Sequence, residues 1–246
     1  MNVGLFIPCY VDQFYPQVGI ATLQLLEKFG CDVSYPLNQT CCGQPMANSG
    51  FEHLAKGCNE LFIKNFSAFD YIVCPSGSCT LHIKDHLHDE QQEGKAVHIR
   101  SGIYELTEFL VDVLHVEKLD AKFPHKVGLH QSCHGQRGLH LSQMSELVAA
   151  PFSKPLRLLN MVNGIQLTEL SRVDECCGFG GTFCVFEEAV SVKMGKDRVR
   201  DHIQHGAEFI TAADMSCLMH LEGILRRQKS KVQVKHIAEI LNGDDE

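Results

Sequence analysis

The sequence Cys-Cys-Gly occurs twice in this chain, at Cys41-Cys42-Gly43 and at Cys176-Cys177-Gly178. Neighbouring side chains of an extended backbone point to opposite faces, so two adjacent thiols can reach one metal only where the backbone turns. Glycine permits such a turn because it lacks a Cβ and readily adopts a positive φ. Two buried free cysteines in a loop are the simpler interpretation, but packing alone gives little reason for the pair to occur twice. The motif therefore predicts two sites in which paired thiols bind a common group.

Charge and cysteine content narrow the classes of function. The 246 residues carry a net charge of −8 without a dense basic run, which argues against a nucleic-acid partner. No apolar run approaches the roughly 18 to 20 residues of a membrane span, and the first residues resemble a strand rather than a signal peptide. We therefore expect a cytoplasmic protein, in which the twelve cysteines stay reduced and serve metal binding or redox chemistry.

Short apolar runs alternate with segments of helical periodicity. Such alternation predicts parallel βαβ units. The expected strands are residues 3–10, 31–35, 71–74, 126–133 and 207–214, and the expected helices include residues 18–26, 51–66 and 102–116.

The order of motifs in the first half recurs in the second. Cys9 corresponds to Cys133, Cys41 to Cys176 and Cys79 to Cys217, with offsets of 124, 135 and 138 residues. This repetition predicts an internal duplication, with domains at residues 1–120 and 121–246. The expected fold class is α/β, in two tandem pseudo-repeated domains. Each is a small parallel sheet flanked by helices, with a cysteine site at the carboxyl ends of its strands.

Cysteines distant in the sequence are expected to converge in each domain. Ligands of open parallel sheets bind beyond the carboxyl ends of the strands, where these cysteines fall. The candidate metal ligands are Cys9, Cys41, Cys42 and Cys79 in the first half, and Cys133, Cys176, Cys177 and Cys217 in the second. Four thiolates select zinc or an iron-sulfur cluster. The spacing matches neither a zinc ribbon nor a bacterial ferredoxin, and an iron-sulfur cluster is favoured, with zinc as the alternative in one or both sites.

At this level of detail the sequence resembles the CCG (cysteine-rich) domain family, in the branch of lactate utilization protein A, over essentially the full chain. Related domains occur in the B subunit of heterodisulfide reductase and in the iron-sulfur subunit of glycolate oxidase. The segments that carry the resemblance are residues 6–9, 41–45, 74–79, 130–134 and 175–183.

The resemblance implies an iron-sulfur subunit of a multi-component oxidoreductase. The implied complex is of the L-lactate dehydrogenase type and oxidises L-lactate to pyruvate. Its electrons would pass through cysteine-ligated clusters, which are expected to be of the 4Fe-4S type. The implied partners are other iron-sulfur and flavin-linked subunits, and the substrate is a small 2-hydroxy acid. Whether catalysis lies in this chain or in a partner stays open. The alternatives are a structural zinc-binding scaffold subunit of such a complex and a thiol-disulfide reductase subunit of the heterodisulfide type.

The chain departs from the heterodisulfide pattern at one position of each half. Related proteins close each motif with Cys-x-x-Cys, whereas this chain has Ser76-x-x-Cys79 and Asp214-x-x-Cys217. Cys74 adds a fifth candidate cofactor-binding cysteine in the first half. In the second half, an oxygen ligand from Asp214, a plainer cluster or zinc is possible.

Other residues near the motifs are weaker candidates. His130 and His134 flank Cys133 and could bind metal or move a proton, although a hydrogen-bonded loop histidine is the simpler interpretation of His130. Arg137 could neutralise the thiolate site or form a surface salt bridge. The basic residues Lys193, Lys196, Arg198 and Arg200 are expected on a solvated helix face, and Cys31, Cys58 and Cys184 are not expected to be ligands. Dinucleotide-binding, Walker A and His-Glu-x-x-His motifs are lacking, which disfavours an autonomous nicotinamide dehydrogenase, a nucleotide hydrolase and a metalloprotease.

Overall fold

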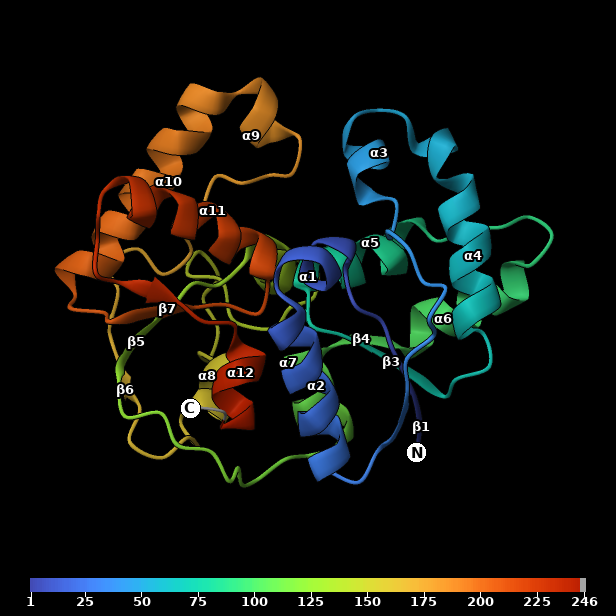
Figure 1. The fold of residues 1–246 in the computed structure, drawn as a ribbon, viewed down its shortest axis with the longest axis horizontal. Helices are drawn as coiled ribbons and strands as arrows, with labels where there is room; N and C mark the ends of the chain where they lie inside the picture. Colours follow the sequence, from blue (N-terminus) through green and yellow to red (C-terminus); the bar gives the residue numbers. More distant parts are fainter. Residues whose placement is uncertain (244–246) are drawn as a thin grey trace. The chain divides into compact units, whose positions relative to one another are not determined.

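The structure is a computed structural model that describes residues 1–243. It divides into two compact units, Met1–Leu114 and His115–Glu246. Each unit contains one four-stranded parallel sheet, and helices flank the strands (Figure 1). The predicted α/β fold with two pseudo-repeated parallel sheets is confirmed.

The first unit has the strand order β2-β1-β3-β4. Its strands are β1 (Asn2–Leu5), β2 (Asp32–Ser34), β3 (Tyr71–Cys74) and β4 (Ile103–Glu105). Its helices are α1 (Cys9–Phe14), α2 (Pro16–Lys28), α3 (Gln44–Asn48), the short 3-10 helix η1 (Glu52–Ala55), α4 (Lys56–Phe66), α5 (Gly77–His86), α6 (Glu93–Gly102), α7 (Leu106–Glu108) and the π-helical turn η2 (Phe109–Val113).

The second unit repeats this topology with the strand order β6-β5-β7-β8. Its strands are β5 (Lys126–Leu129), β6 (Gln166–Leu167), β7 (Phe209–Thr211) and β8 (Gln233–Val234). Its helices are the π-helical turn η3 (His134–Gly138), α8 (Lys154–Leu159), α9 (Phe183–Phe186), α10 (Glu188–Gln204), α11 (Met215–Arg227) and α12 (Ile237–Asn242). In both units the central pair is formed by the strands before the first and the last cysteine of the site.

The expected helix at 102–116 is wrong in its first part. Residues Ile103–Glu105 form β4 and pair with residues 72–74 of β3. Ile103 is fully buried against this strand, and burial in a sheet outweighs the helical spacing of the apolar residues. The side chain of Glu105 then caps α7 by accepting from the N–H groups of Thr107 and Glu108, so the helix begins only after the strand.

The first strand of each unit is shorter than the sequence suggests. β1 ends at Leu5 and Cys9 is already the first residue of α1, after Pro8 at the N-cap. β5 ends at Leu129, and Cys133 precedes the turn η3. In the first unit Pro8 contributes to this, because proline fixes φ and has no N–H, which suits a helix start and disfavours a continuing strand. The first cysteine of each site therefore lies in the loop or helix that follows the strand.

The two units have different side chains behind the central strands. In the first unit the ring of Phe6 packs edge-to-face against Phe62 at 4.8 Å and against Phe66 at 5.8 Å between centroids. In the second unit the buried polar groups Arg198 and His202 of α10 lie against β5, since Arg198 donates to the carbonyl of Leu129 and His202 adjoins Gly128. Among the described residues, no helix combines the length and apolar character that crossing a membrane requires.

Candidate metal centre

The candidate site of the first unit lies where β1 and β3 end. Cys9 begins α1, Cys79 is the third residue of α5, and Cys41 and Cys42 lie in the loop before α3. Both neighbouring strands are parallel, so the segments that follow them leave the same edge of the sheet. This topology brings together side chains that are far apart in the sequence.

The four thiols of the first unit are in hydrogen-bond contact in one series. Cys9 contacts Cys41, Cys41 contacts Cys42, and Cys42 contacts Cys79. Cys9 is exposed and Cys41 is half-buried, whereas Cys42 and Cys79 are 4% and 5% exposed. The series therefore runs from the surface into the core, where Cys42 and Cys79 are shielded from solvent.

The second unit contains the same series in the same order. Cys133 contacts Cys176, Cys176 contacts Cys177, and Cys177 contacts Cys217. Cys133 and Cys176 are half-buried, and Cys177 and Cys217 are buried. The structure thus brings together the four predicted cysteines of each half, and their role as ligands is taken up below as a proposal.

A glycine turn positions each cysteine pair. Gly43 has φ +94° and Gly178 has φ +85°, a conformation that favours glycine. The turn directs the N–H of Gly43 to Sγ of Cys41 at 3.4 Å and the N–H of Gly178 to Sγ of Cys176 at 3.3 Å. Each turn therefore supplies a backbone donor to the first sulfur of the pair.

The first cysteine of each pair is the favoured thiolate. Hydrogen bonds from Cys42 and Cys9, together with the N–H of Gly43, lower the pKa of Cys41. Hydrogen bonds from Cys133 and Cys177, with the N–H of Gly178, lower the pKa of Cys176 in the same way. The thiolate is the form that binds metal, so each site contains a sulfur prepared for ligation.

The departure from Cys-x-x-Cys has a local structural reason. Ser76 is the N-cap of α5 and its Oγ accepts from the N–H of Cys79 at 3.3 Å. Asp214 is the N-cap of α11 and its Oδ1 accepts from the N–H of Ser216 at 3.1 Å. Serine and aspartate are preferred N-caps, so these residues hold the helix whose first turn carries the last cysteine of the site.

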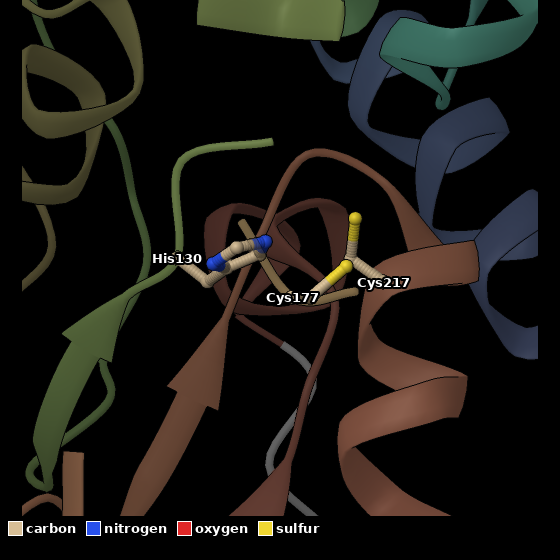
Figure 2. A group of neighbouring side chains, drawn as sticks. All are labelled: His130, Cys177 and Cys217. Carbon is tan, nitrogen blue, oxygen red and sulfur yellow. The ribbon is translucent and has the colours of Figure 1, made fainter. Parts of the chain in front are cut away.

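A histidine adjoins the inner sulfurs of the second site. His130 follows β5 and is 1% exposed, and a potential ligand atom of its ring lies within 4.8 Å of the sulfurs of Cys177 and Cys217. Figure 2 shows one ring nitrogen directed toward these two sulfurs. Among the described residues, Nε2 of His130 is buried without a hydrogen-bond partner. A buried polar atom without a hydrogen-bond partner lowers folding stability by about 1 to 3 kcal/mol. This ring nitrogen is therefore suited to interact with a group bound between it and the sulfurs.

The ring of His130 is neutral. Burial and the adjacent Arg198 lower the pKa of His130 to about 3. Nε of Arg198 donates to Nδ1 of His130 at 3.1 Å. The sequence interpretation of His130 as a hydrogen-bonded histidine agrees with this contact, although its buried partner could not be foreseen.

The expected solvated face of the basic helix is wrong for Arg198. Arg198 is fully buried on α10 and pairs with Asp201 at 3.2 Å. Its remaining donors reach the carbonyl oxygens of Arg172 and Leu129. The sequence does not distinguish Arg198 from its basic neighbours, because Lys193 and Arg200 of the same helix are exposed. Only the fold shows which position faces inward.

Sequence reasoning missed a second pair of histidines. His82 lies three residues after Cys79, and His220 lies three residues after Cys217. Nε2 of His82 lies 3.5 Å from the position that a Cβ on Gly43 would occupy, and burial lowers the pKa of His82 to about 4. Burial also lowers the pKa of His220. The repeated pattern Cys-x-x-His was the signal that could have revealed both.

The other candidates lie as follows. Cys74 ends β3 and is fully buried in the core cluster that also contains Cys42 and Cys79. Arg137 forms a salt bridge with Glu146 on the surface, as the second of its interpretations expected. Cys184 donates to the carbonyl oxygen of Gly181 at 3.1 Å.

Cys58 is closer to the first site than expected. The charge of Cys41 acts on its thiol, and its Cβ lies 3.9 Å from the position of a Cβ built on Gly43. Helical periodicity predicted a buried apolar position, whereas Cys58 is half-buried beside the glycine turn. Cys31 is buried just before β2.

Two parallel α/β units, each with four thiols in series at the carboxyl edge of its sheet, define a duplicated cysteine-rich domain protein. Such a donor set fits binding of a soft metal. The family model described as CCG, Cysteine-rich domain, matches residues 3–84 and 127–222, and the chain belongs to this family. The family resemblance predicted from the sequence is confirmed.

Curated relatives match the chain over nearly its whole length. Lactate utilization protein A of Bacillus subtilis (strain 168) is 42% identical over 246 residues, which cover 98% of this chain and 99% of that protein. Lactate utilization protein A of Exiguobacterium sp. (strain ATCC BAA-1283 / AT1b) is also 42% identical, over 98% of this chain and 97% of that protein. Among solved structures, a hypothetical protein from Helicobacter pylori aligns with a TM-score of 0.61 at 14% identity, over 100% of this chain and 49% of that chain, which shows the fold alone.

Proposed function

We propose that this chain is an iron-sulfur subunit of a multi-component oxidoreductase that oxidises L-lactate to pyruvate. The observation that carries the proposal is the pair of equal thiol series, Cys9-Cys41-Cys42-Cys79 and Cys133-Cys176-Cys177-Cys217. Four thiols that converge twice from distant segments are the donor set of a soft metal centre, and core packing does not require them.

The residues around the sulfurs suit a buried redox centre. The inner thiols, Cys42 and Cys177, are 4% and 2% exposed, so a centre there would be shielded from water on one side. The half-buried Cys41 and Cys176 receive N–H groups from the glycine turns. A cluster held by these thiols would accept and release single electrons, at a potential set by burial and hydrogen bonds to sulfur.

The relatives named lactate utilization protein A support lactate as the source of the electrons. Oxidation of L-lactate to pyruvate releases two electrons and two protons. In the proposed complex a flavin-linked partner would take the electron pair, and clusters held by the two thiol series would supply one-electron steps to an acceptor. This chain would supply the cysteine ligands of the clusters and the buried, hydrogen-bonded surroundings that set their potential. The partner would remove hydrogen from lactate.

The first experiment measures what the two sites bind. Protein purified without oxygen is analysed for iron, acid-labile sulfide and zinc, and its absorbance is recorded before and after dithionite. We expect iron and sulfide, with a broad visible band that dithionite bleaches. Stoichiometric zinc in a colourless protein would contradict the proposal and support the structural zinc scaffold.

Matched variants assign the metal to the thiols. Cys42→Ser and Cys177→Ser should each lower iron and sulfide by about half, because each removes an inner ligand of one site. Cys31→Ser and Cys184→Ser are the controls, since both thiols lie outside the two series. Growth on L-lactate of a deletion strain complemented with each variant then tests the substrate. Equal metal content and equal growth for all four variants would refute the assignment.

A further inference from the structure

A buried polar chain ends at the inner sulfurs of the second site. Asp201 pairs with Arg198 at 3.2 Å, and Nε of Arg198 donates to Nδ1 of His130 at 3.1 Å. Arg198 and His130 are 0% and 1% exposed, so this contact is closed to bulk water. One ring nitrogen of His130 thus contacts the guanidinium of Arg198. Figure 2 shows a ring nitrogen of His130 directed toward the sulfurs of Cys177 and Cys217.

The contact with Arg198 determines where His130 carries its proton. A guanidinium has donors only, so Nδ1 must be the acceptor, and the single proton of the neutral ring is on Nε2. A histidine that binds a metal shows the opposite arrangement, in which the second nitrogen donates to a carboxylate, carbonyl or water. His130 therefore directs an N–H group, and not a lone pair, toward the sulfurs. That N–H has no partner within residues 1–243.

The first unit has a phenyl ring at the equivalent position. Phe6 precedes Cys9 by three residues, as His130 precedes Cys133. The backbone N–H of Phe6 donates to the carbonyl of Val73 at 2.9 Å, and that of His130 donates to the carbonyl of Thr211 at 2.7 Å, so the two residues occupy matching places beside the sheet. Phe6 packs among Phe62 and Phe66 and offers no donor to the first site.

We propose that His130 is a hydrogen-bond donor to the sulfurs of the second centre, fixed in this tautomer by Arg198 and Asp201, and that it makes this centre easier to reduce than the first. The inference rests on the proposed function, namely that both sites hold redox-active metal. Reduction adds negative charge, much of it on sulfur, and an N–H group aimed at sulfur in a dry site stabilises that charge. His130 acts as a positioning and tuning residue and is not a metal ligand.

The test compares His130→Leu with His130→Gln in redox titrations followed by electron paramagnetic resonance. Leucine removes the donor, whereas glutamine can accept from Arg198 with Oε1 and donate toward sulfur with Nε2. The second centre is identified as the one whose signal Cys177→Ser abolishes. We expect His130→Leu to reduce its reduction equilibrium constant about tenfold, which is 59 mV for a one-electron couple, while His130→Gln retains most of the wild-type value.

Two controls come from the same samples. The potential of the first centre should not change, because Phe6 and not His130 adjoins it. Iron and sulfide per chain should also not change in His130→Leu, because no ligand is lost. The wild-type protein labelled with nitrogen-15 histidine should show only the weak nitrogen coupling of a hydrogen-bonded ring, a measurement that remains decisive if His130→Leu does not fold.

Four results would overturn the inference. An unchanged potential in His130→Leu would show that no hydrogen bond acts on the centre. A loss of iron in that variant, or a strong nitrogen coupling in the wild type, would make His130 a ligand. In these three cases the proposed function stands. Wild-type protein that contains no iron and sulfide would instead refute the proposed function, and this inference with it.

Discussion

Gly178 is the residue at which a single methyl group should disturb the second site most selectively. Its φ of +85° already disfavours alanine, and a Cβ there would meet Cβ of Met194 and the carbonyl oxygen of Ser191, both at 2.7 Å. Gly206 provides the matched control, since it lies in the same unit with φ +75° and has nothing within 4 Å of an added Cβ. The pair Gly178→Ala and Gly206→Ala therefore separates crowding from backbone strain.

The two substitutions change the conformational energy of the backbone by the same amounts. Each forces an L-residue into the left-handed region, at about 1 to 2 kcal/mol, and each restricts the unfolded chain, which offsets about 0.4 to 1 kcal/mol. Gly178→Ala adds overpacking against buried Ser191, at about 1 to 3 kcal/mol. It also strains the bond from Oγ of Ser191 to the carbonyl of Gly178 at 2.7 Å, worth about 1 kcal/mol. We expect Gly178→Ala to lose about 2 to 4 kcal/mol more folding free energy than Gly206→Ala.

The assay is urea unfolding of the reduced, metal-free protein, with hydrogen exchange of α10 peptides to report the second unit. The midpoint for Gly178→Ala should fall well below that for Gly206→Ala at a similar m-value. Anaerobic metal loading of Gly178→Ala should also fall, because the turn directs the paired sulfurs. Equal midpoints for the two variants would show that the turn is loose and that the reasoning from its contacts is wrong.

Two further predictions follow from buried charges. Arg198→Met should destabilise the second unit by about 3 to 5 kcal/mol, because the buried Asp201 would lose its guanidinium partner and keep only the N–H groups of Ser171 and Arg172 and the ring of His205. Arg200→Met on the exposed face should cost less than about 1 kcal/mol, and urea midpoints that fall equally would refute this. Burial raises the pKa of Glu105 from 4.5 to about 8. The contribution of Glu105 to folding stability is therefore fully present below about pH 4.5, and up to about 4 kcal/mol of it is lost as the pH rises to about 8. Glu105→Gln should remove this pH dependence from urea midpoints measured between about pH 5 and pH 8, and an unchanged dependence would contradict the assignment.

The sequence was sufficient for the duplicated parallel fold and for the convergence of the thiols. Both follow from local signals, namely apolar runs that end near cysteine and a topology that places strand ends at one edge. The glycine after each cysteine pair could be foreseen for the same reason, since an adjacent pair needs a backbone turn and Gly43 and Gly178 both have positive φ.

Some other features could not be predicted from the sequence, because they depend on packing between distant segments. The strands β4 and β8 have three and two residues, too few for a period of two to be visible. The burial of Arg198 depends on which face of α10 meets the sheet, and its neighbours in sequence are exposed. The pairs Cys79-x-x-His82 and Cys217-x-x-His220 did not depend on packing, because the alignment of Cys79 with Cys217 already places His82 opposite His220.

The repeat separates what the site needs from what differs between its two copies. The order of thiols, the glycine turn and the helix that carries the last cysteine occur in both units, whereas the residue behind the inner sulfurs is Phe6 in one and His130 in the other. Equal ligands in unequal surroundings would give two centres of the same kind with different potentials. If both sites hold redox-active centres as proposed, the N–H of His130 would favour the electron on the second centre, a difference that two identical copies could not provide.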